Sequence, residues 1–197
     1  RARMRAEMGA GSEFIWLTAG RIVPAKDYPN LLRAFARVRA AYSETRLWVA
    51  GNGDVDELSD LIVFADELNL RGQVRWLGLR RDMAALLDAA DGFLLASAWE
   101  GMPLAAGEAM AMEKPVAATD VGGVRELMGE TGFIVPAKSP EALAGAMLEW
   151  MRTTNEARRA LGRAGRERIM AYFSMDAKVV EWEALYRAVL EKTIDLR

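Results

Sequence analysis

Two acidic side chains on either side of a short turn are the most chemically suggestive feature of the sequence. Glu100 follows an apolar run, and Glu108 lies eight residues later on a stretch of helical period. Gly101 and the residues after it place backbone amides, notably those of Leu104 and Ala105, at a helix N-terminus where a phosphate can bind. Carboxylates accept hydrogen bonds from paired hydroxyls, so one acid can hold sugar hydroxyls and the other a ribose. The alternative is a surface acid followed by an ordinary helix-face acid.

A second loop, residues 20–27, contains two cations after the first apolar run. Arg21 and Lys26 would meet an anionic diphosphate together with a nearby helix N-terminus, a combination that stabilises negative charge on a departing nucleotide. Asp27 is predicted to cap the following helix, with Pro29 in its first turn. Taken alone, this loop is explained as well by an Arg and a Lys exposed to solvent.

The loop at residues 51–54 is weaker evidence for a ligand site. Its glycines would let a backbone approach a ligand, but Asn-Gly is also a generic turn pair. Asp54 and Asp56 form an Asp-x-Asp string of the kind that can hold a divalent metal. We favour the simpler interpretation, in which the acids stabilise the N-terminus of a helix. No metal and no other cofactor is therefore expected.

The composition narrows the class of protein. A chain of 197 residues that is 52% hydrophobic can bury one sizeable core. It has no Cys and no His, which excludes thiolate zinc sites, cysteine nucleophiles and His-dependent triads. The 26 Lys and Arg balance 28 Asp and Glu without a long basic block, so nucleic acid is not expected as a partner. No apolar run approaches the roughly 20 residues that span a bilayer, and a soluble domain is expected.

Short apolar runs alternate with stretches of helical period along most of the chain. The predicted strands are residues 14–19, 46–50, 74–77, 92–96, 115–118 and 132–135. The predicted helices between and after them are residues 30–41, 58–68, 82–90, 104–112, 141–152, 156–172 and 176 to about 191. This order predicts an α/β fold with a doubly wound, Rossmann-like parallel sheet of about six strands, helices on both faces and a helical C-terminal tail. Ligands of such sheets bind beyond the carboxyl ends of the strands, at the point where strand order reverses.

The two ends of the chain are expected to lie outside the Rossmann-like domain. Residues 1–13 begin without an initiator Met and are predicted to be a residual linker, so the chain is interpreted as an excised fragment. Residues 14–175 are predicted to form the Rossmann-like domain. In residues 176–197 apolar side chains spread over more than one helix face, which leaves three alternatives: packing on the same domain, crossing to another domain, or self-association of the fragment.

The order and spacing of these motifs resemble the carboxy-terminal domain of family-four retaining glycosyltransferases, one half of the two-domain GT-B fold. The strongest part is the stretch from Glu100 to Ala111, continued by residues 114–126. The loop containing Arg21 and Lys26, the turn at residues 51–53 and the segment 74–82 occur in the same order, so the resemblance covers nearly the whole chain.

The resemblance implies roles for particular residues. Arg21 and Lys26 would contact the donor diphosphate, Glu100 would bind hydroxyls of the donor sugar, and Glu108 would bind the ribose. Arg21, Lys26 and Glu100 are the predicted catalytic residues. The predicted donor-binding residues are Gly20, Arg21, Lys26, Arg80, Glu100, Gly101, Met102, Leu104, Ala105 and Glu108.

Other positions carry weaker predictions. Leu79 and Arg80 are candidates for the nucleotide base by their place after the third strand more than by their side chains. Gly122 and Gly123 either border the sugar pocket or simply form a turn, and Glu126 is taken as structural.

The implied activity is transfer of a sugar from a nucleoside diphosphate sugar, such as a UDP-sugar, to an acceptor hydroxyl with retention of configuration, as in polysaccharide biosynthesis. The implied partners are that donor and a missing N-terminal domain with the acceptor site, without which the fragment would be inactive. A cytoplasmic location is implied, with peripheral association of the full-length protein at the inner face of a membrane left open. Two alternatives remain: a non-catalytic nucleotide-sugar-binding module, and half of another GT-B-like enzyme such as an epimerase or phosphorylase.

Overall fold

Six parallel strands form the central sheet of the protein, seen here in a computed structural model that describes residues 1–194, with side chains to residue 191. The spatial order of the strands is β3-β2-β1-β4-β5-β6. Their bounds are β1 Phe14–Ala19, β2 Thr45–Ala50, β3 Val74–Trp76, β4 Gly92–Leu95, β5 Val116–Thr119 and β6 Phe133–Val135. The order reverses between β1 and β4, which pair directly through Trp16 with Gly92 and Leu17 with Phe93. This gap is the switch point of a doubly wound sheet.

The strands are apolar on both faces because helices cover both sides of the sheet. In β1, Ile15 and Leu17 pack into one core cluster, while Trp16 packs into the other. The same alternation continues in β2, where Trp48 joins the first cluster and Leu47 the second. This burial on both faces explains why β1, β4 and β5 are almost entirely apolar, whereas the edge strand β3 carries the exposed Arg75.

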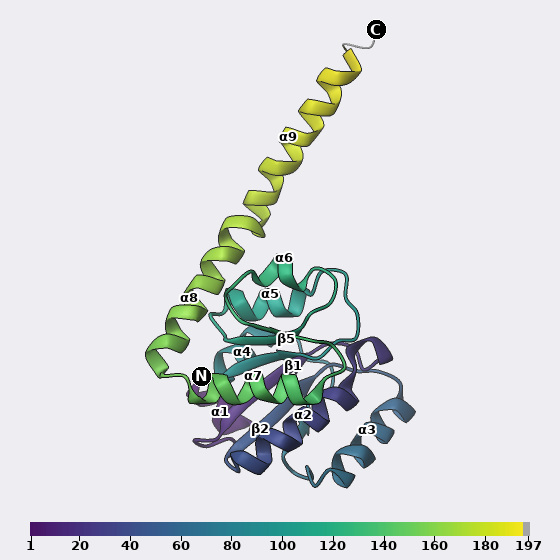
Figure 1. The fold of residues 1–197 in the computed structure, drawn as a ribbon, viewed down its shortest axis with the longest axis vertical. Helices are drawn as coiled ribbons and strands as arrows, with labels where there is room; N and C mark the ends of the chain where they lie inside the picture. The colour runs from purple at the N-terminus through teal and green to yellow at the C-terminus, as the bar shows by residue number, and fades with distance from the viewer. Residues whose placement is uncertain (195–197) are drawn as a thin grey trace.

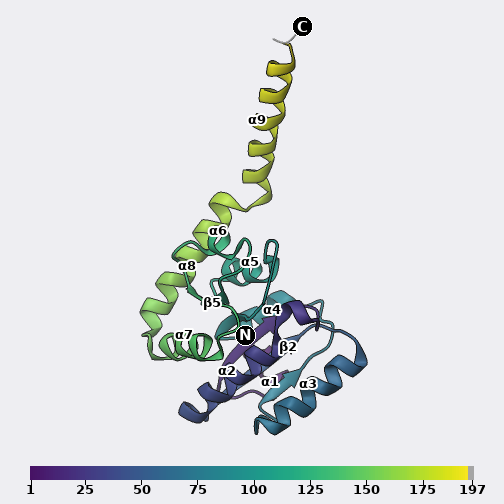
Figure 2. The same ribbon diagram turned by 45° about the vertical axis from the view of Figure 1, so that its right-hand side comes forward.

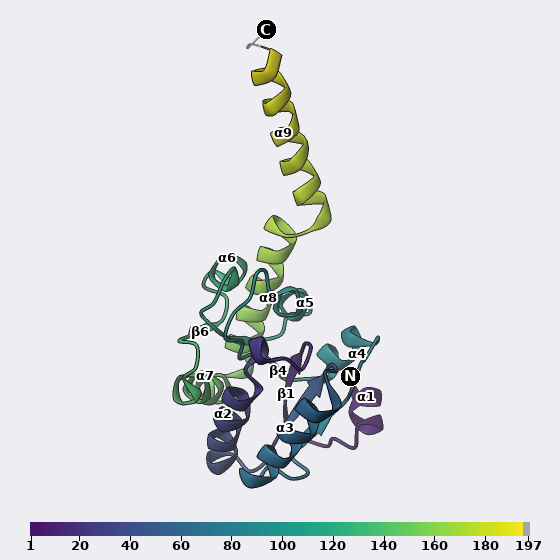
Figure 3. The same cartoon turned by 90° about the vertical axis from the view of Figure 1, so that its right-hand side faces the viewer.

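The helices divide between the two faces. Figure 3 shows α2 and α7 on one side of β1 and β4, with α1 and α4 on the other. The element bounds are α1 Ala2–Glu7, η1 Pro24–Lys26, α2 Tyr28–Ala41, α3 Val55–Glu67, α4 Met83–Ala89, α5 Leu104–Ala111, α6 Val124–Met128, α7 Pro140–Arg152, α8 Asn155–Tyr172 and α9 Met175–Ile194. The predicted fold class is therefore confirmed. The main deviations are three short helices outside the predicted ranges, α1, η1 and α6, and the early starts of α2 and α3. Asp27 caps α2 as predicted, since its Oδ1 accepts from Asn30 N at 3.3 Å, and α2 begins two residues before the predicted start.

The N-terminal segment packs on the fold. Met8 is 6% exposed and belongs to the core cluster beside α4. The Arg5 guanidinium donates to the carbonyls of Gly11 and Ala89 and to the Asp91 carboxylate. Residues 1–13, expected to be a linker, thus contain a short helix tied to the body, and their assignment as a separate segment stays a prediction.

The last helix, α9, extends away from the domain, whereas α8 packs on it through Arg168, which donates to the Leu127 and Glu126 carbonyls. Figures 1 and 2 show α9 continuing outward from the end of α8, away from the sheet. The described side chains of α9 are at most partly buried, and Val180, Trp182 and Tyr186 are more than half exposed. Residues 195–197, at the end of the predicted tail, lie outside the described residues. Among the described helices, none combines the length and apolarity that crossing a membrane requires.

Candidate functional site

The loops after β1 and β4 meet at the switch point. The Ala98 amide donates to the Ala25 carbonyl at 2.8 Å, joining the two loops through their backbones. Beside this bond, Lys26 Nζ donates to Glu100 Oε1 at 2.5 Å. These residues are 74 positions apart in the chain, and the fold brings the predicted diphosphate cation and the predicted sugar-binding acid into one ion pair.

Glu100 has a second donor in the same place. The Ser97 hydroxyl donates to Glu100 Oε1 at 2.6 Å, and Ser97 is fully buried. The Glu100 side chain itself is only 11% exposed. Because hydrogen bonds to an ionised acceptor are stronger than neutral ones, two donors hold this carboxylate in a defined position.

The loops after β1, β2 and β3 are also tied together through backbone bonds. Gly20 N donates to Ala50 O at 3.0 Å, and Gly51 N donates to Gly78 O at 2.8 Å. Gly51 has φ +142, and a Cβ there would lie 1.8 Å from the Gly20 carbonyl oxygen. The glycine in this turn is therefore required by contact between two loops, which accounts for it without a ligand.

A cavity of about 250 Å³ opens where these loops end. Its walls come from the carboxyl ends of β1 and β2, from the loop after β3 and from the first turn of α5. The lining residues are Ala19, Gly20, Arg21, Ala50, Gly51, Asn52, Leu79, Arg80, Met83 and Ala105. Four of the predicted donor-binding residues, Gly20, Arg21, Arg80 and Ala105, thus share one cavity. Lys26 adjoins it, because a Cβ on Gly20 would lie 3.1 Å from Lys26 Cε.

The two arginines in this cavity differ in their partners. Arg21 is exposed, and its side chain has no hydrogen bond or ion pair with any described residue. The Arg80 guanidinium instead makes two bonds to the Asp82 carboxylate, at 2.8 and 2.6 Å. These bonds raise the pKa of Arg80 and lower the pKa of Asp82. Arg21 therefore has a guanidinium free for an anion, whereas that of Arg80 is already engaged.

The start of α5 uses one of the two amides proposed to bind phosphate. Leu104 N donates to the Met102 carbonyl at 3.0 Å, inside the turn that precedes the helix. Ala105 N has no acceptor among the described residues. Pro103 is the N-cap residue, where its missing N–H costs little. The amide at Ala105 is thus the one available to an anion.

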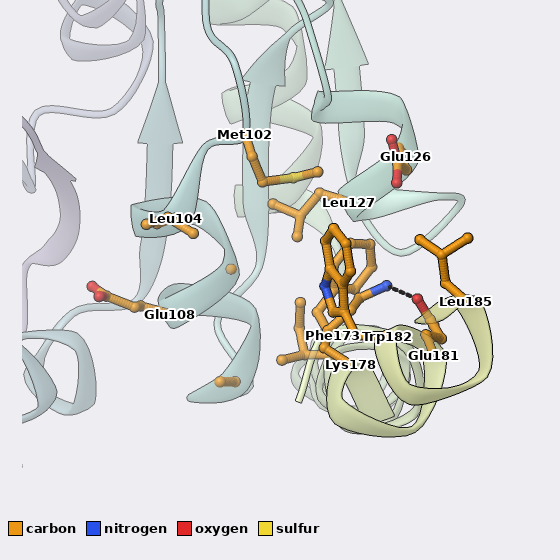
Figure 4. A pocket seen from close by; sticks show the side chains of 13 residues that line it. Met102, Leu104, Glu108, Glu126, Leu127, Phe173, Lys178, Glu181, Trp182 and Leu185 are labelled. Atoms are coloured by element: carbon orange, nitrogen blue, oxygen red, sulfur yellow. Dashed lines mark hydrogen bonds and ion pairs between the residues drawn. The ribbon is translucent and has the colours of Figure 1, made fainter. Parts of the chain in front are cut away.

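Glu108 lies one turn further along α5 and is exposed. It borders a second, larger cavity of about 750 Å³ between α5, α6 and α9, as do Met102 and Leu104. Figure 4 shows that the Glu108 carboxylate points to the opposite side of α5 from Phe173 and Trp182. The predicted site residues are therefore distributed around the first turns of α5, with Ala105 on the small cavity and Met102 and Leu104 on the large one.

The loop after β5 contacts the backbone of the segment that contains Glu100. Gly123 N donates to Gly101 O at 2.8 Å. Gly122 has φ +49, and a Cβ there would lie 2.0 Å from the Glu100 carbonyl oxygen. Besides the two interpretations offered by the sequence, the structure gives a third. These glycines allow close contact with the backbone that carries Glu100.

The acids after β2 are structural in this fold. Asp54 is the N-cap of α3 and accepts from Asp56 N at 2.9 Å. Asp56 and Glu57 occupy the first turn, where acids stabilise a helix. Within the described residues, no three Asp or Glu side chains come together as a set of metal ligands.

Two residues of this region had no predicted role. Ser97 holds Glu100, and the buried Tyr28 donates its hydroxyl to Gly20 O at 3.1 Å. A small polar residue at the end of an apolar run was the available signal for Ser97. No local signal distinguishes Tyr28 from an ordinary aromatic residue of the core.

The chain is similar to known proteins over most of its length. A family model described as glycosyl transferases group 1 matches residues 1–168. The lipopolysaccharide core biosynthesis glycosyltransferase LpsE of Rhizobium meliloti is 31% identical over 163 residues, covering 82% of this chain and 46% of LpsE.

Solved structures agree with this match in fold. A sucrose-phosphate synthase from Thermosynechococcus elongatus has a TM-score of 0.82 and 29% identity, covering 98% of this chain and 49% of the synthase. HepE of Anabaena, in a structure with UDP and glucose, has a TM-score of 0.81 at 23% identity, covering 95% of this chain and 51% of HepE. The chain thus spans about half the length of these three proteins.

Proposed function

Because this chain belongs to the glycosyl transferases group 1 family, we propose that it is the donor-binding half of a retaining glycosyltransferase. In the proposed reaction, the bond between the anomeric carbon of the donor sugar and the diphosphate oxygen breaks. The acceptor hydroxyl oxygen bonds to that carbon on the same face, and its proton passes to the departing diphosphate. The observation that carries the proposal is the ion pair between Lys26 and Glu100 across the switch point.

The leaving diphosphate would be held at the small cavity. Lys26 lies beside Gly20 there, and neither the Arg21 guanidinium nor the Ala105 amide has a partner among the described residues. Positive groups placed where negative charge develops lower the barrier to departure of the nucleotide. Two side-chain cations and an amide meet this need, so the proposed mechanism uses no metal ion.

The remaining donor groups would be held on either side of the diphosphate. Glu100 would accept hydrogen bonds from sugar hydroxyls, with Gly101 and Met102 beside it, and Glu108 would accept from the ribose hydroxyls. Leu79 and Arg80 would border the base, mainly through backbone groups, since the Arg80 guanidinium is engaged with Asp82. UDP-sugars are the first donor class to test, because the similar HepE structure contains UDP and glucose.

The acceptor site would belong to another part of the full-length protein. The chain covers 46% of LpsE and 49% of the sucrose-phosphate synthase, so a comparable length remains for a second domain. Exposed Val180, Trp182 and Tyr186 on α9 would then be covered by that domain, to which residues 176–197 would cross. On this proposal the 197-residue chain binds donor but transfers no sugar alone.

Calorimetric titration of the chain with UDP, GDP, ADP and their glucose conjugates, without metal, tests the proposal. We expect saturable binding of one nucleotide family. Lys26→Ala and Glu108→Ala should each weaken it about tenfold or more, because each removes a charged hydrogen-bonding group.

Matched controls are Lys178→Ala and Glu126→Ala, which change the same residue types on the large cavity (Figure 4). We expect both to bind within about twofold of the unsubstituted chain, because they lie on the α6 and α9 side of that cavity, whereas the Glu108 carboxylate points to the opposite side of α5. Absence of binding by the folded chain, or equal losses in the controls, would contradict the proposal.

A further inference from the structure

The two donors to Glu100 converge on one oxygen. Lys26 Nζ and Ser97 Oγ both donate to Oε1, at 2.5 and 2.6 Å. Oε2 receives no hydrogen bond from the described residues. One oxygen is therefore used to hold the carboxylate, and the other keeps its lone pairs for a ligand.

If the proposed function holds, the Lys26 ammonium has a second partner, because it would contact the donor diphosphate as well as Glu100. An ammonium is a point charge with three donors, so it can turn toward a phosphate and weaken its bond to a carboxylate. The Ser97 hydroxyl is fully buried and donates to no other group among the described residues. It remains as the donor that holds Oε1 while Lys26 is shared.

We propose that Ser97 is a positioning residue that keeps Oε2 of Glu100 directed at the donor sugar while Lys26 neutralises the diphosphate. This inference rests on the proposed function. Ser97 does not touch the donor and acts through Glu100. Its effect is therefore confined to the sugar and does not extend to the nucleotide.

The surroundings of Ser97 suit a positioning role. The Thr119 hydroxyl, fully buried at the end of β5, donates to the Ser97 carbonyl at 2.7 Å. The Glu100 backbone is in turn backed by Gly122, where any side chain would collide with the Glu100 carbonyl. The backbone at Ser97 is therefore held in place. A fixed support of this kind is needed to hold the Glu100 side chain within a fraction of an ångström.

The test compares two ligands on the same chain, UDP and UDP-glucose, with GDP and ADP and their glucose conjugates run in parallel. In Ser97→Ala we expect affinity for the binding nucleoside diphosphate to change by less than about twofold, and affinity for its sugar conjugate to fall about tenfold. Ser97→Cys, which replaces the hydroxyl by a somewhat larger thiol that donates only weakly, should show the same selective loss.

A double-substitution cycle separates positioning from general structure. Once Glu100→Ala has removed the carboxylate, adding Ser97→Ala should cost no further affinity for the sugar conjugate, because Ser97 acts only through Glu100. Thr45→Val is the matched structural control. It removes another fully buried hydroxyl, which donates to Phe14 O at 2.9 Å where β2 begins, and should leave both affinities unchanged.

A selective loss in Ser97→Ala that disappears in the Glu100→Ala background supports the inference. Equal losses for nucleotide and conjugate, additive effects, or no effect of Ser97→Ala and Ser97→Cys would overturn it while leaving the proposed function intact. If the folded chain binds none of the six ligands, the proposed function fails and the positioning role fails with it.

Discussion

At the scale of single residues, charge pairing separates the groups free for a ligand from those already used. Arg80 is neutralised by Asp82, and Lys26 is paired with Glu100. Arg21 is the cation of the small cavity whose side chain has no partner among the described residues. An anion entering this cavity would therefore meet Arg21 first and would compete with Glu100 for Lys26.

Tyr28 leads to a prediction about stability at alkaline pH. Its hydroxyl supports Gly20, and burial raises the pKa of Tyr28 well above its usual range. Below the ordinary tyrosine pKa of about 10 the phenol is protonated in both states. Above it the unfolded chain loses the proton while the folded chain keeps it, so stability falls as pH rises.

The measurement is urea unfolding of the chain and of Tyr28→Phe between about pH 8 and 11. At pH 8 we expect Tyr28→Phe to lose about 1 kcal/mol with the hydrogen bond. Above about pH 10 the unsubstituted chain should lose up to about 1.4 kcal/mol per pH unit more than Tyr28→Phe does. Parallel losses in both proteins would show that Tyr28 does not hold its proton on folding.

At the scale of elements, the site is a set of loops held by one another and by the strand ends. Backbone bonds join the loop after β1 to those after β2 and β4, and the loop after β5 supports the segment at Glu100. Such mutual bonding fixes loops that would otherwise be mobile. By contrast, α9 makes few contacts with the rest of the domain, since its described side chains are at most partly buried.

This contrast predicts that α9 adds little to the stability of the domain. A chain that ends at Ser174 should unfold within about 4 °C of the full chain, because few apolar contacts are lost. The comparison is Trp150→Ala in α7. Trp150 is fully buried and donates to Val116 O at 3.2 Å, so its loss should cost about 3 kcal/mol or more. Thermal unfolding checks both, and a large loss on truncation would mean that α9 packs on the body.

At the scale of the whole molecule, two core clusters lie on opposite faces of one sheet, and the loops that contain the predicted site residues project from one edge of it. The rigid sheet therefore positions the loops, and bound donor would stabilise the folded state as a whole by mass action.

We accordingly expect the nucleotide that binds to raise the unfolding temperature. At a concentration of about 100 times Kd, the folded state gains about 2.7 kcal/mol. In a domain of this size that corresponds to a rise of about 5 to 10 °C. A thermal scan with UDP, GDP and ADP measures this rise. Glu126→Ala should match the unsubstituted chain, whereas Glu108→Ala should lose about half of the rise or more. Similar rises with all three nucleotides would argue against a base-selective site.

The sequence by itself determined the order of strands and helices, because the spacing of apolar residues reports which local structure can bury them. It also placed Arg21, Lys26, Glu100 and Glu108 in or beside the correct post-strand loops. Their roles in donor binding stay predictions. The direct contact of Lys26 with Glu100 depends on β1 and β4 being neighbours, which no local pattern specifies.

The tertiary structure alone decided which polar groups near the site are free. It showed that Leu104 N is used within its own turn, that Arg80 is engaged by Asp82, and that Ser97 and Lys26 share one oxygen of Glu100. It also showed that residues 1–13 pack on the body through Met8. These facts depend on distances between groups brought together by packing, whereas sequence periodicity reports only the environment of each segment.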